Sequence, residues 1–200
     1  MLRKRLREAL GHVGRALREP EQFVTRWYLG EVRYSPAVWA ALIATSITGT
    51  MSYGMTMGIL SGPEHLLLGG LELTIAAGLA WAIPLPALYI FNSLTGARLS
   101  AADTLLAAIV TTSWGGLAMI ASIPINWFFT VSVPVPWFVR IVNVVVFTGV
   151  GGAMIDVFGR VFSALGPRGG RAPAWLLVLV AAIGPEFFHA FRLFEFAEGK

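Results

Sequence analysis

Long runs of uncharged, apolar residues separated by short gaps dominate the chain from Ala37 onward. Five such runs can be drawn, at approximately residues 37–60, 66–91, 101–123, 137–162 and 173–194. A helix needs about 20 apolar residues to cross roughly 30 Å of hydrocarbon, and each run is long enough. Only 13% of the 200 residues are charged, whereas an average soluble domain has about a quarter. The pattern predicts an all-α, polytopic membrane helix bundle with five transmembrane helices.

The first 36 residues differ from the rest because they are charged and contain no long apolar run. Apolar residues recur there at helical spacing, with basic residues between them, at Leu2, Leu6, Leu10, Val13 and Leu17. This spacing predicts an amphipathic helix. The gaps between the later runs are too short to fold separately. We therefore predict a cytoplasmic amphipathic segment, residues 1–36, followed by one transmembrane domain, residues 37–200.

We expect the N-terminal helix to lie on the cytoplasmic leaflet, where basic side chains meet anionic lipid headgroups. The membrane-surface residues in this interpretation are Arg3, Lys4, Arg5 and Arg7. Docking onto a cytoplasmic partner is the alternative. Nucleic acid is not an expected partner, because the basic residues have no aromatic residues between them and the segment adjoins a membrane span.

Lysine and arginine are unevenly distributed between the gaps. If the N-terminus is cytoplasmic, twelve of the 15 basic residues lie on the cytoplasmic side, and Arg140, Arg192 and Lys200 remain outside. This follows the positive-inside rule and agrees with an odd number of spans. We predict a bacterial inner (cytoplasmic) membrane protein with a cytoplasmic N-terminus and a periplasmic C-terminus. The chain has no cysteine, so disulfides, thiol catalysis and cysteine-ligated metals are excluded.

Small residues at four-residue spacing predict where the first two spans touch. Hydrocarbon gives helices no hydrophobic reason to associate, so residues that allow close backbone approach are important. These helix-packing residues are Ser46, Thr50, Gly54 and Gly58 on the first span, and Gly70 and Gly78 on the second. We expect the two rows to face each other, and either row is a candidate surface for oligomerisation. The two prolines of "AIPLPALYIF" should kink the second span.

Two acidic residues near span ends have simple structural interpretations. Asp103 follows Ser100 at the start of the third span, where a carboxylate caps the helix N-terminus. Asp156 and Arg160 lie four residues apart near the cytoplasmic end of the fourth span, and at this spacing they can form an ion pair on one helix face.

A set of polar residues from three spans falls at similar depth on the outer side: Glu72, Arg140, Asn143, Glu186 and His189. Charges within a membrane need partners. One interpretation is a structural network in which Arg140 lies between Glu72 and Glu186, and we expect Glu186 to pair with Arg140. A second is a proton or ion path. A third is a metal site on the E-x-x-H pair Glu186 and His189. Such sites need a second E-x-x-H and further glutamates, which the sequence lacks, so we predict no metal.

No catalytic motif is present: the chain has no Gly-rich phosphate loop, no G-x-S-x-G and no H-E-x-x-H. We therefore expect neither enzymatic activity nor a cofactor. A lipid- or pigment-binding subunit is a further alternative, because tryptophans could contact lipid or a flat cofactor, although near span ends they most simply form an aromatic belt. They are Trp39, Trp81, Trp114, Trp127, Trp137 and Trp175.

The segment "LTGARLSAADTLLAAIVTTSWGGLAMIA" contains a short Gly-containing loop followed by a span that begins with small polar residues. With five spans, a cytoplasmic N-terminus and no extramembrane domain, the chain resembles the Yip1-like membrane proteins over residues 37–194, by topology. The resemblance implies a non-enzymatic scaffold or adaptor. Small size and the small-residue rows also favour a structural or accessory subunit, bound in the lipid bilayer to other membrane proteins. A small channel or transporter subunit that uses the outer polar residues is the alternative.

Overall fold

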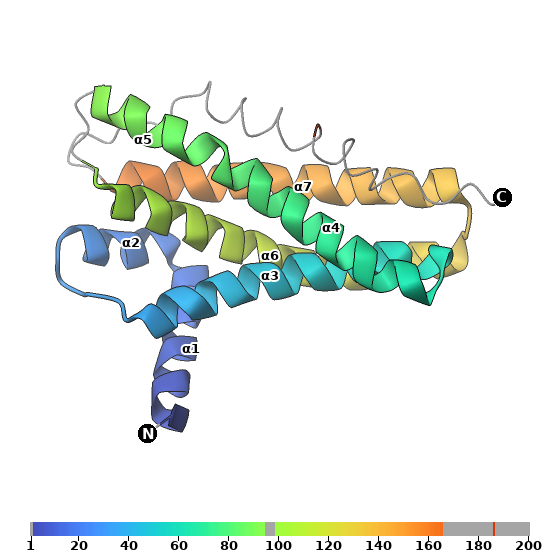
Figure 1. Cartoon of the computed structure of the whole chain (residues 1–200), viewed down its shortest axis with the longest axis horizontal. Coiled ribbons are helices and arrows are strands. Elements are labelled where there is room, and N and C mark those ends of the chain that lie inside the picture. The colour runs from blue at the N-terminus through green and yellow to red at the C-terminus, as the bar shows by residue number, and fades with distance from the viewer. Residues whose placement is uncertain (1, 95–98, 166–185, 187–200) are drawn as a thin grey trace.

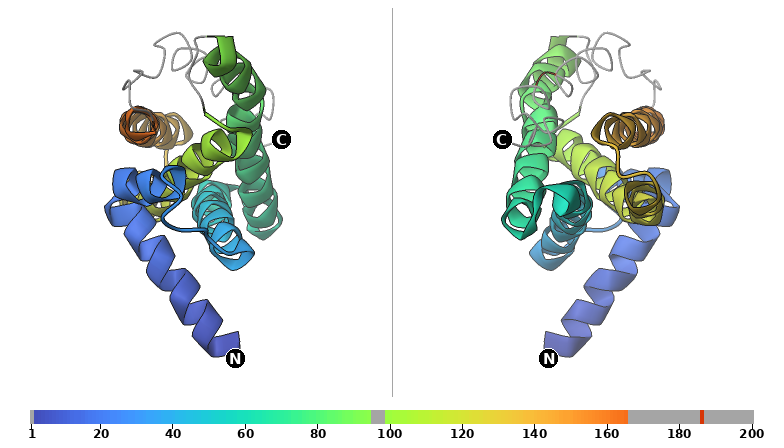
Figure 2. Two further views of the ribbon diagram at one scale, coloured as in Figure 1. Left: turned by 90° about the vertical axis from the view of Figure 1, so that its left-hand side faces the viewer. Right: turned by 90° about the vertical axis from the view of Figure 1, so that its right-hand side faces the viewer.

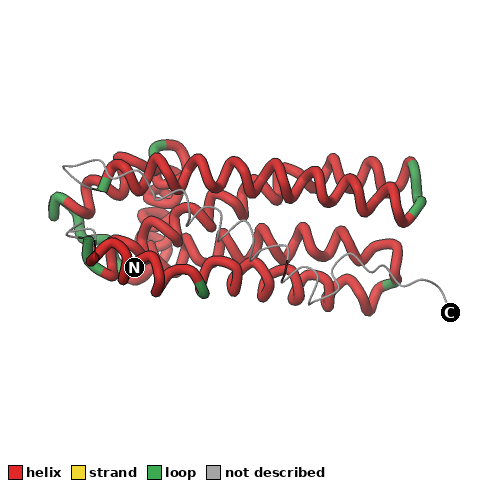
Figure 3. The backbone as a smooth tube through the Cα atoms, turned by 90° about the horizontal axis from the view of Figure 1, so that it is seen from above, coloured by secondary structure: helices red, strands yellow, loops and turns green. Residues whose placement is uncertain are grey.

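The computed structural model describes residues 2–94, 99–165 and 186, and every regular element in these residues is helical (Figure 3). The elements are α1 (Leu2–Arg18), α2 (Pro20–Tyr28), α3 (Pro36–Met57), the 3-10 helix η1 (Gly58–Ser61), α4 (Pro63–Ala82), α5 (Pro84–Leu94), α6 (Ala101–Ser132) and α7 (Pro136–Ala164). The predicted all-α class is confirmed for this part of the chain. The predicted fifth span, residues 173–194, lies outside the described residues apart from Glu186.

Proline and one capping box set the helix starts. Proline is the first residue of α2, α3, α4, α5 and α7, a position where its missing N–H would have had no helical partner. α6 begins with the predicted cap: the Asp103 N–H donates to Ser100 Oγ over 3.2 Å, and the Ser100 N–H donates to Asp103 Oδ2 over 2.9 Å. The expected kink in the second span is a break between α4 and α5, at Pro84.

Four helices, α3, α4, α6 and α7, extend along the long axis of the molecule (Figure 1). α3 packs against both α4 and α6, and α6 packs against α7. In the end-on views α4 and α7 lie on opposite sides of α6 (Figure 2). The central pair, α3 and α6, therefore holds the bundle together, and α4 and α7 each have a face turned away from it.

Three helical stretches among the described residues are long and apolar enough to cross a membrane: His65–Ile90, Ala101–Ser132 and Pro136–Ala164. They correspond to the predicted second, third and fourth spans. α3 has 22 residues and matches the predicted first span in position, but it is less apolar because serine, threonine and glycine are frequent in "ATSITGTMSYGMT". These small residues include the ones that contact α4 and α6.

α6 is longer than its predicted range of 101–123, since it continues through Pro124 to Ser132. The sequence "PINWFFTVSVPVP" suggested a loop because it contains three prolines and an asparagine. Within a helix a proline removes one backbone hydrogen bond, and membrane helices tolerate this loss where neighbours compensate. Asn126 and Thr130 in this extension are buried, 0% and 2% exposed. The extension therefore belongs to the packed bundle.

The N-terminal segment forms two helices, where the sequence predicted one. α1 ends at Arg18, and α2 begins at Pro20 and packs against α1, α6 and α7. Val13 and Ala16 of α1 and Phe23 and Val24 of α2 are buried in one cluster with residues of the bundle, among them Phe158. The second half of α1 and the whole of α2 are thus packed into the same core as the bundle. α1 itself runs across the long axis, and its first turns leave the bundle (Figure 1).

Candidate functional site

The predicted outer polar set is not brought together as one cluster. Asn143 is fully buried, Glu72 is partly buried, and Arg140 and Glu186 are exposed. No ion pair joins Arg140 to Glu186 or to Glu72, all three of which are described. His189 lies outside the described residues.

Helix geometry explains why Arg140 and Asn143 point to different environments. Val139 and Asn143 are one turn apart, and both face the interior, with exposures of 1% and 0%. Successive residues on a helix are rotated by about 100°, so a face that buries Val139 turns Arg140 away. The expected Arg140–Glu186 pair is therefore absent from the described structure, and Asn143 forms its hydrogen bond with a residue outside the predicted set.

That partner is Tyr53 of α3, which is fully buried. Its hydroxyl donates to Asn143 Oδ1 over 2.9 Å, and Asn143 Nδ2 donates to the Val139 carbonyl over 2.9 Å. The Tyr53 carbonyl accepts from Thr56 Oγ1 over 2.6 Å, and Thr56 Oγ1 accepts from Asn126 Nδ2 over 2.9 Å. We call Tyr53, Thr56, Asn126 and Asn143 the interior network, which links α3, α6 and α7.

The interior network is built from neutral side chains. A neutral hydrogen bond between membrane helices contributes on average about 0.6 kcal/mol, and it fixes which residues face each other. Two buried atoms of α6, Asn126 Oδ1 and Thr130 Oγ1, have no hydrogen-bond partner among the described residues. The arrangement is suited to aligning three helices, because it offers no carboxylate, histidine or lysine that could carry a proton.

The sequence identified Asn143 but missed Tyr53, Thr56 and Asn126. Asparagine within an apolar run is a recognisable signal, because a buried amide in hydrocarbon needs a hydrogen-bond partner. Asn126 was missed because its prolines placed it in a predicted loop. Tyr53 was missed because a tyrosine in an apolar run does not by itself reveal whether it faces the interior.

The predicted small-residue rows on α3 and α4 make close contacts, but in a different register. A Cβ added at Gly54 would lie 2.5 Å from the Gly69 carbonyl oxygen, and one added at Gly58 would lie 2.4 Å from the His65 carbonyl oxygen. Gly70 lies against the Met51 backbone, and Thr50 Oγ1 is 3.3 Å from Thr74 Oγ1. These contacts hold α3 and α4 together at backbone distance.

Two residues of the predicted rows lie elsewhere. Ser46 belongs to the α6 side of α3, since a Cβ added at Gly116 of α6 would lie 2.8 Å from the Ser46 Cα. The tightest approach of all is on this side: a Cβ at Gly49 would lie 2.0 Å from the Gly116 carbonyl oxygen. Gly78 of α4 is exposed, and no described heavy atom lies within 4 Å of a Cβ added there.

Gly78 is part of an outward face of α4. Leu68, Leu71 and Ile75 on this face are 51%, 48% and 50% exposed, and Glu72 lies at its edge. Glu72 makes no hydrogen bond or ion pair with the described residues. It lies about 14 Å along the helix axis from Pro63, the first residue of α4, and within the apolar stretch His65–Ile90. We call these residues the α4 outer face.

Charged groups at the opposite end of the bundle do have partners, which fasten α2 to the bundle. Glu21 of α2 forms an ion pair with Arg160 of α7, which also contacts Asp156 over 3.0 Å, the predicted partner four residues away. Trp27 Nε1 donates to Asp103 Oδ1 over 3.0 Å. Asp103 is thus both the cap of α6 and an anchor for α2.

The aromatic side chains beside this anchor surround Tyr34. Its ring stacks on Phe23 with centroids 4.0 Å apart, and its hydroxyl donates to the Phe23 carbonyl over 2.8 Å. Burial raises the pKa of Tyr34 above its ordinary value, and the positive charges of Arg26 and Arg15 partly oppose this.

The contacts described above are packing contacts, hydrogen bonds and ion pairs. Within residues 2–94, 99–165 and 186, no three histidine or acidic side chains gather in a way that could hold a metal ion. Comparison with family models, curated proteins and solved structures finds no match for the chain. The similarity to the Yip1-like proteins stays a prediction from topology.

Proposed function

We propose that the chain is an accessory or scaffold subunit of the membrane that binds another membrane protein through the α4 outer face. The full proposal has five spans, with α3 as the first and residues 173–194 as the fifth. The N-terminus is cytoplasmic, the C-terminus is periplasmic, and the membrane is a bacterial inner membrane. The basic N-terminal segment supports this orientation.

The observation that carries the proposal is Glu72, a carboxylate at membrane depth without a partner among the described residues. An isolated charge in hydrocarbon is costly, so such groups normally pair with another polar group. The interior network leaves Glu72 out, and the side chains beside it on α4 are apolar and exposed. A transmembrane helix of another protein that carries a hydrogen-bond donor or a cation at this depth would satisfy the carboxylate.

Gly78 on the same face provides a second argument. A glycine in a helix interior costs about 1 kcal/mol relative to alanine, and in α4 no described neighbour makes use of its small size. Small residues are enriched where membrane helices approach each other closely. We expect the partner helix to pack closely against α4 at Gly78.

Site-specific crosslinking in native membranes tests the proposal. The chain has no cysteine, so an Ile75→Cys variant carries a single reactive thiol on the α4 outer face. Val145→Cys on α7 is the matched control, because Val145 is also apolar and is 64% exposed, and α7 lies on the opposite side of α6 from α4 (Figure 2). We expect Ile75→Cys to crosslink to a partner segment with a basic or amide side chain within one turn, and Glu72→Gln to lower the yield several-fold.

Two results would overturn this function. One is an absence of adducts from Ile75→Cys, and the other is an equal yield from Val145→Cys that is indifferent to Glu72→Gln. Purified protein in liposomes separates the transport alternative, since an accessory subunit should add no proton or ion flux. Flux above background that Glu72→Gln abolishes would favour a channel or transporter.

A further inference from the structure

We infer that the first half of α1 is an arm that binds the surface of an anionic lipid bilayer beside the bundle. This inference concerns the lipid and is independent of the protein partner proposed for α4. It begins from the position of α1, which runs across the long axis of the bundle and diverges from it (Figures 1 and 2). In a membrane-spanning bundle, a helix across the long axis lies parallel to the membrane plane.

The level at which α1 leaves the bundle matches a membrane surface. α3 has 22 residues, which span about 33 Å, close to the roughly 30 Å of a hydrocarbon core. Val13 and Ala16 of α1 are buried in one cluster with Val38 and Leu42, in the first two turns of α3. α1 is therefore attached where α3 begins, at the edge of the hydrocarbon.

The apolar stripe of α1 changes its environment along the helix. Val13 is 6% exposed, because it packs on the bundle, whereas Leu10, one turn earlier, is 58% exposed. The sequence continues the same stripe with Leu6 and Leu2. At Leu10 the stripe thus leaves the protein core and is exposed, and a bilayer interface can bury an apolar helix edge of this kind.

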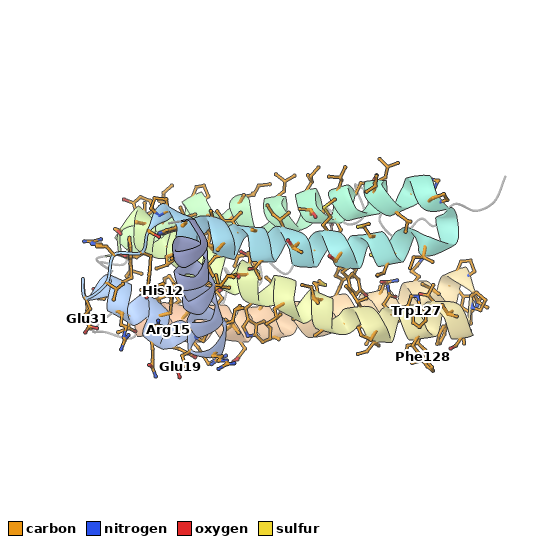
Figure 4. The ribbon with its side chains drawn as sticks, turned by 90° about the horizontal axis from the view of Figure 1, so that it is seen from below. His12, Arg15, Glu19, Glu31, Trp127 and Phe128 are labelled. Carbon is orange, nitrogen blue, oxygen red and sulfur yellow. The ribbon has the colours of Figure 1, made fainter. Side chains whose placement is uncertain are left out.

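The positive charge of residues 1–18 favours an anionic lipid surface as the binding partner of α1. Residues 1–18 contain Arg3, Lys4, Arg5, Arg7, Arg15 and Arg18, and their single acidic residue is Glu8. Each basic residue close to an anionic leaflet contributes about a fivefold gain in binding. Figure 4 shows His12 and Arg15 on α1 and Glu19 just after it, at the opposite end of the bundle from Trp127 and Phe128.

The second half of α1 is anchored to the bundle, both directly and through α2. α2 follows α1 after one residue, and the Glu21–Arg160 pair and the Trp27–Asp103 hydrogen bond fasten α2 to α7 and α6. The base of the arm is thus fastened to the bundle before the arm meets lipid. Such preorganisation strengthens binding, because less freedom is lost on contact.

The test uses the full-length protein in nanodiscs, with an environment-sensitive fluorophore on a single cysteine. Leu10→Cys places the label on the apolar stripe. Gly11→Cys is the matched control, because Gly11 is exposed on another face and no described atom lies within 4 Å of a Cβ there. The discs contain either phosphatidylcholine alone or phosphatidylcholine with 30% phosphatidylglycerol, in each case with bromine on the acyl chains as quencher.

We expect bromine to quench the Leu10 label at least twofold more in the anionic discs than in the neutral discs, and to leave the Gly11 label unaffected. Replacement of Arg3, Lys4, Arg5 and Arg7 by glutamine should remove the difference between the two compositions. A Leu10 label that stays exposed to water in anionic discs overturns the inference. The apolar stripe of α1 would then be a binding surface for a cytoplasmic protein. Equal quenching in both compositions also overturns it, because anionic lipid would not be selected.

Discussion

The contact between Gly49 and Gly116 predicts that alanine at position 49 is strongly destabilising. The added Cβ would lie 2.0 Å from the Gly116 carbonyl oxygen, 2.3 Å from its carbonyl carbon and 2.5 Å from its Cα. Ordinary van der Waals contact begins at 3.4 Å, so α3 and α6 would have to separate by about 1.4 Å at their crossing point. All three obstructing atoms belong to the backbone, and no side-chain rotation can relieve the overlap.

The magnitude follows from two opposing terms. Overpacking of this kind costs about 1 to 3 kcal/mol, and the upper end applies because two long helices must move apart. The higher helix propensity of alanine stabilises the folded state by about 1 kcal/mol and partly offsets this cost. We expect Gly49→Ala to lower the free energy of unfolding by about 2 kcal/mol. Gly78→Ala, which meets no described atom, should raise it by up to about 1 kcal/mol.

The assay is reversible unfolding in mixed micelles by titration with sodium dodecyl sulfate, followed by circular dichroism. The two variants should differ by about 3 kcal/mol, which is more than a 100-fold change in the folded-to-unfolded ratio. Gly116→Ala should also destabilise, since its Cβ would lie 2.7 Å from the Thr45 carbonyl oxygen. Equal stability of Gly49→Ala and Gly78→Ala, within about 0.5 kcal/mol, would refute the close approach of α3 and α6.

Three further predictions concern the interior network and the N-terminal anchor. Tyr53→Phe removes the donor to Asn143 and should cost about 1 kcal/mol of unfolding free energy in the same titration; an unchanged midpoint would contradict the hydrogen bond. Asp103→Ala removes both the cap of α6 and the acceptor for α2, so limited proteolysis should cut residues 1–36 faster, while a rate equal to that of the wild type would show that the anchor is unimportant. Because burial raises the pKa of Tyr34 above 10.0, the folded segment keeps a proton that the undocked segment loses. Docking should therefore be constant below pH 10 and weaken as the pH rises above it; hydrogen exchange measured across this range should show the loss, and Tyr34→Phe should flatten the profile.

The sequence was sufficient for the helical class and for features that depend on local chemistry. Apolar runs located α4, α6 and α7, the Ser100–Asp103 cap was recognisable from its spacing, and Asp156 and Arg160 pair at the predicted four-residue distance. Each of these follows from residues close together in the chain. Their physics needs no knowledge of the tertiary structure.

Features that depend on rotation of one helix against another could not be predicted in this way. The sequence placed Arg140 and Asn143 at the same depth but did not give the rotation of α7, which buries only Asn143. It grouped Ser46 with Gly54 in one row, whereas α3 uses the former against α6 and the latter against α4. A four-residue spacing drifts around a helix of 3.6 residues per turn, so a long row necessarily meets more than one neighbour.

The composition of α3 has a consequence for the order in which the bundle can assemble. α3 is the first of the long helices to be synthesised, yet its small polar residues make it a weak candidate for transfer into lipid by itself. The surfaces that accommodate those residues belong to α4 and α6, including Gly69 and Gly116, which follow later in the chain. α3 therefore cannot complete its packing until Gly116 has been made, so the central pair of the bundle forms only after the chain has been synthesised as far as α6.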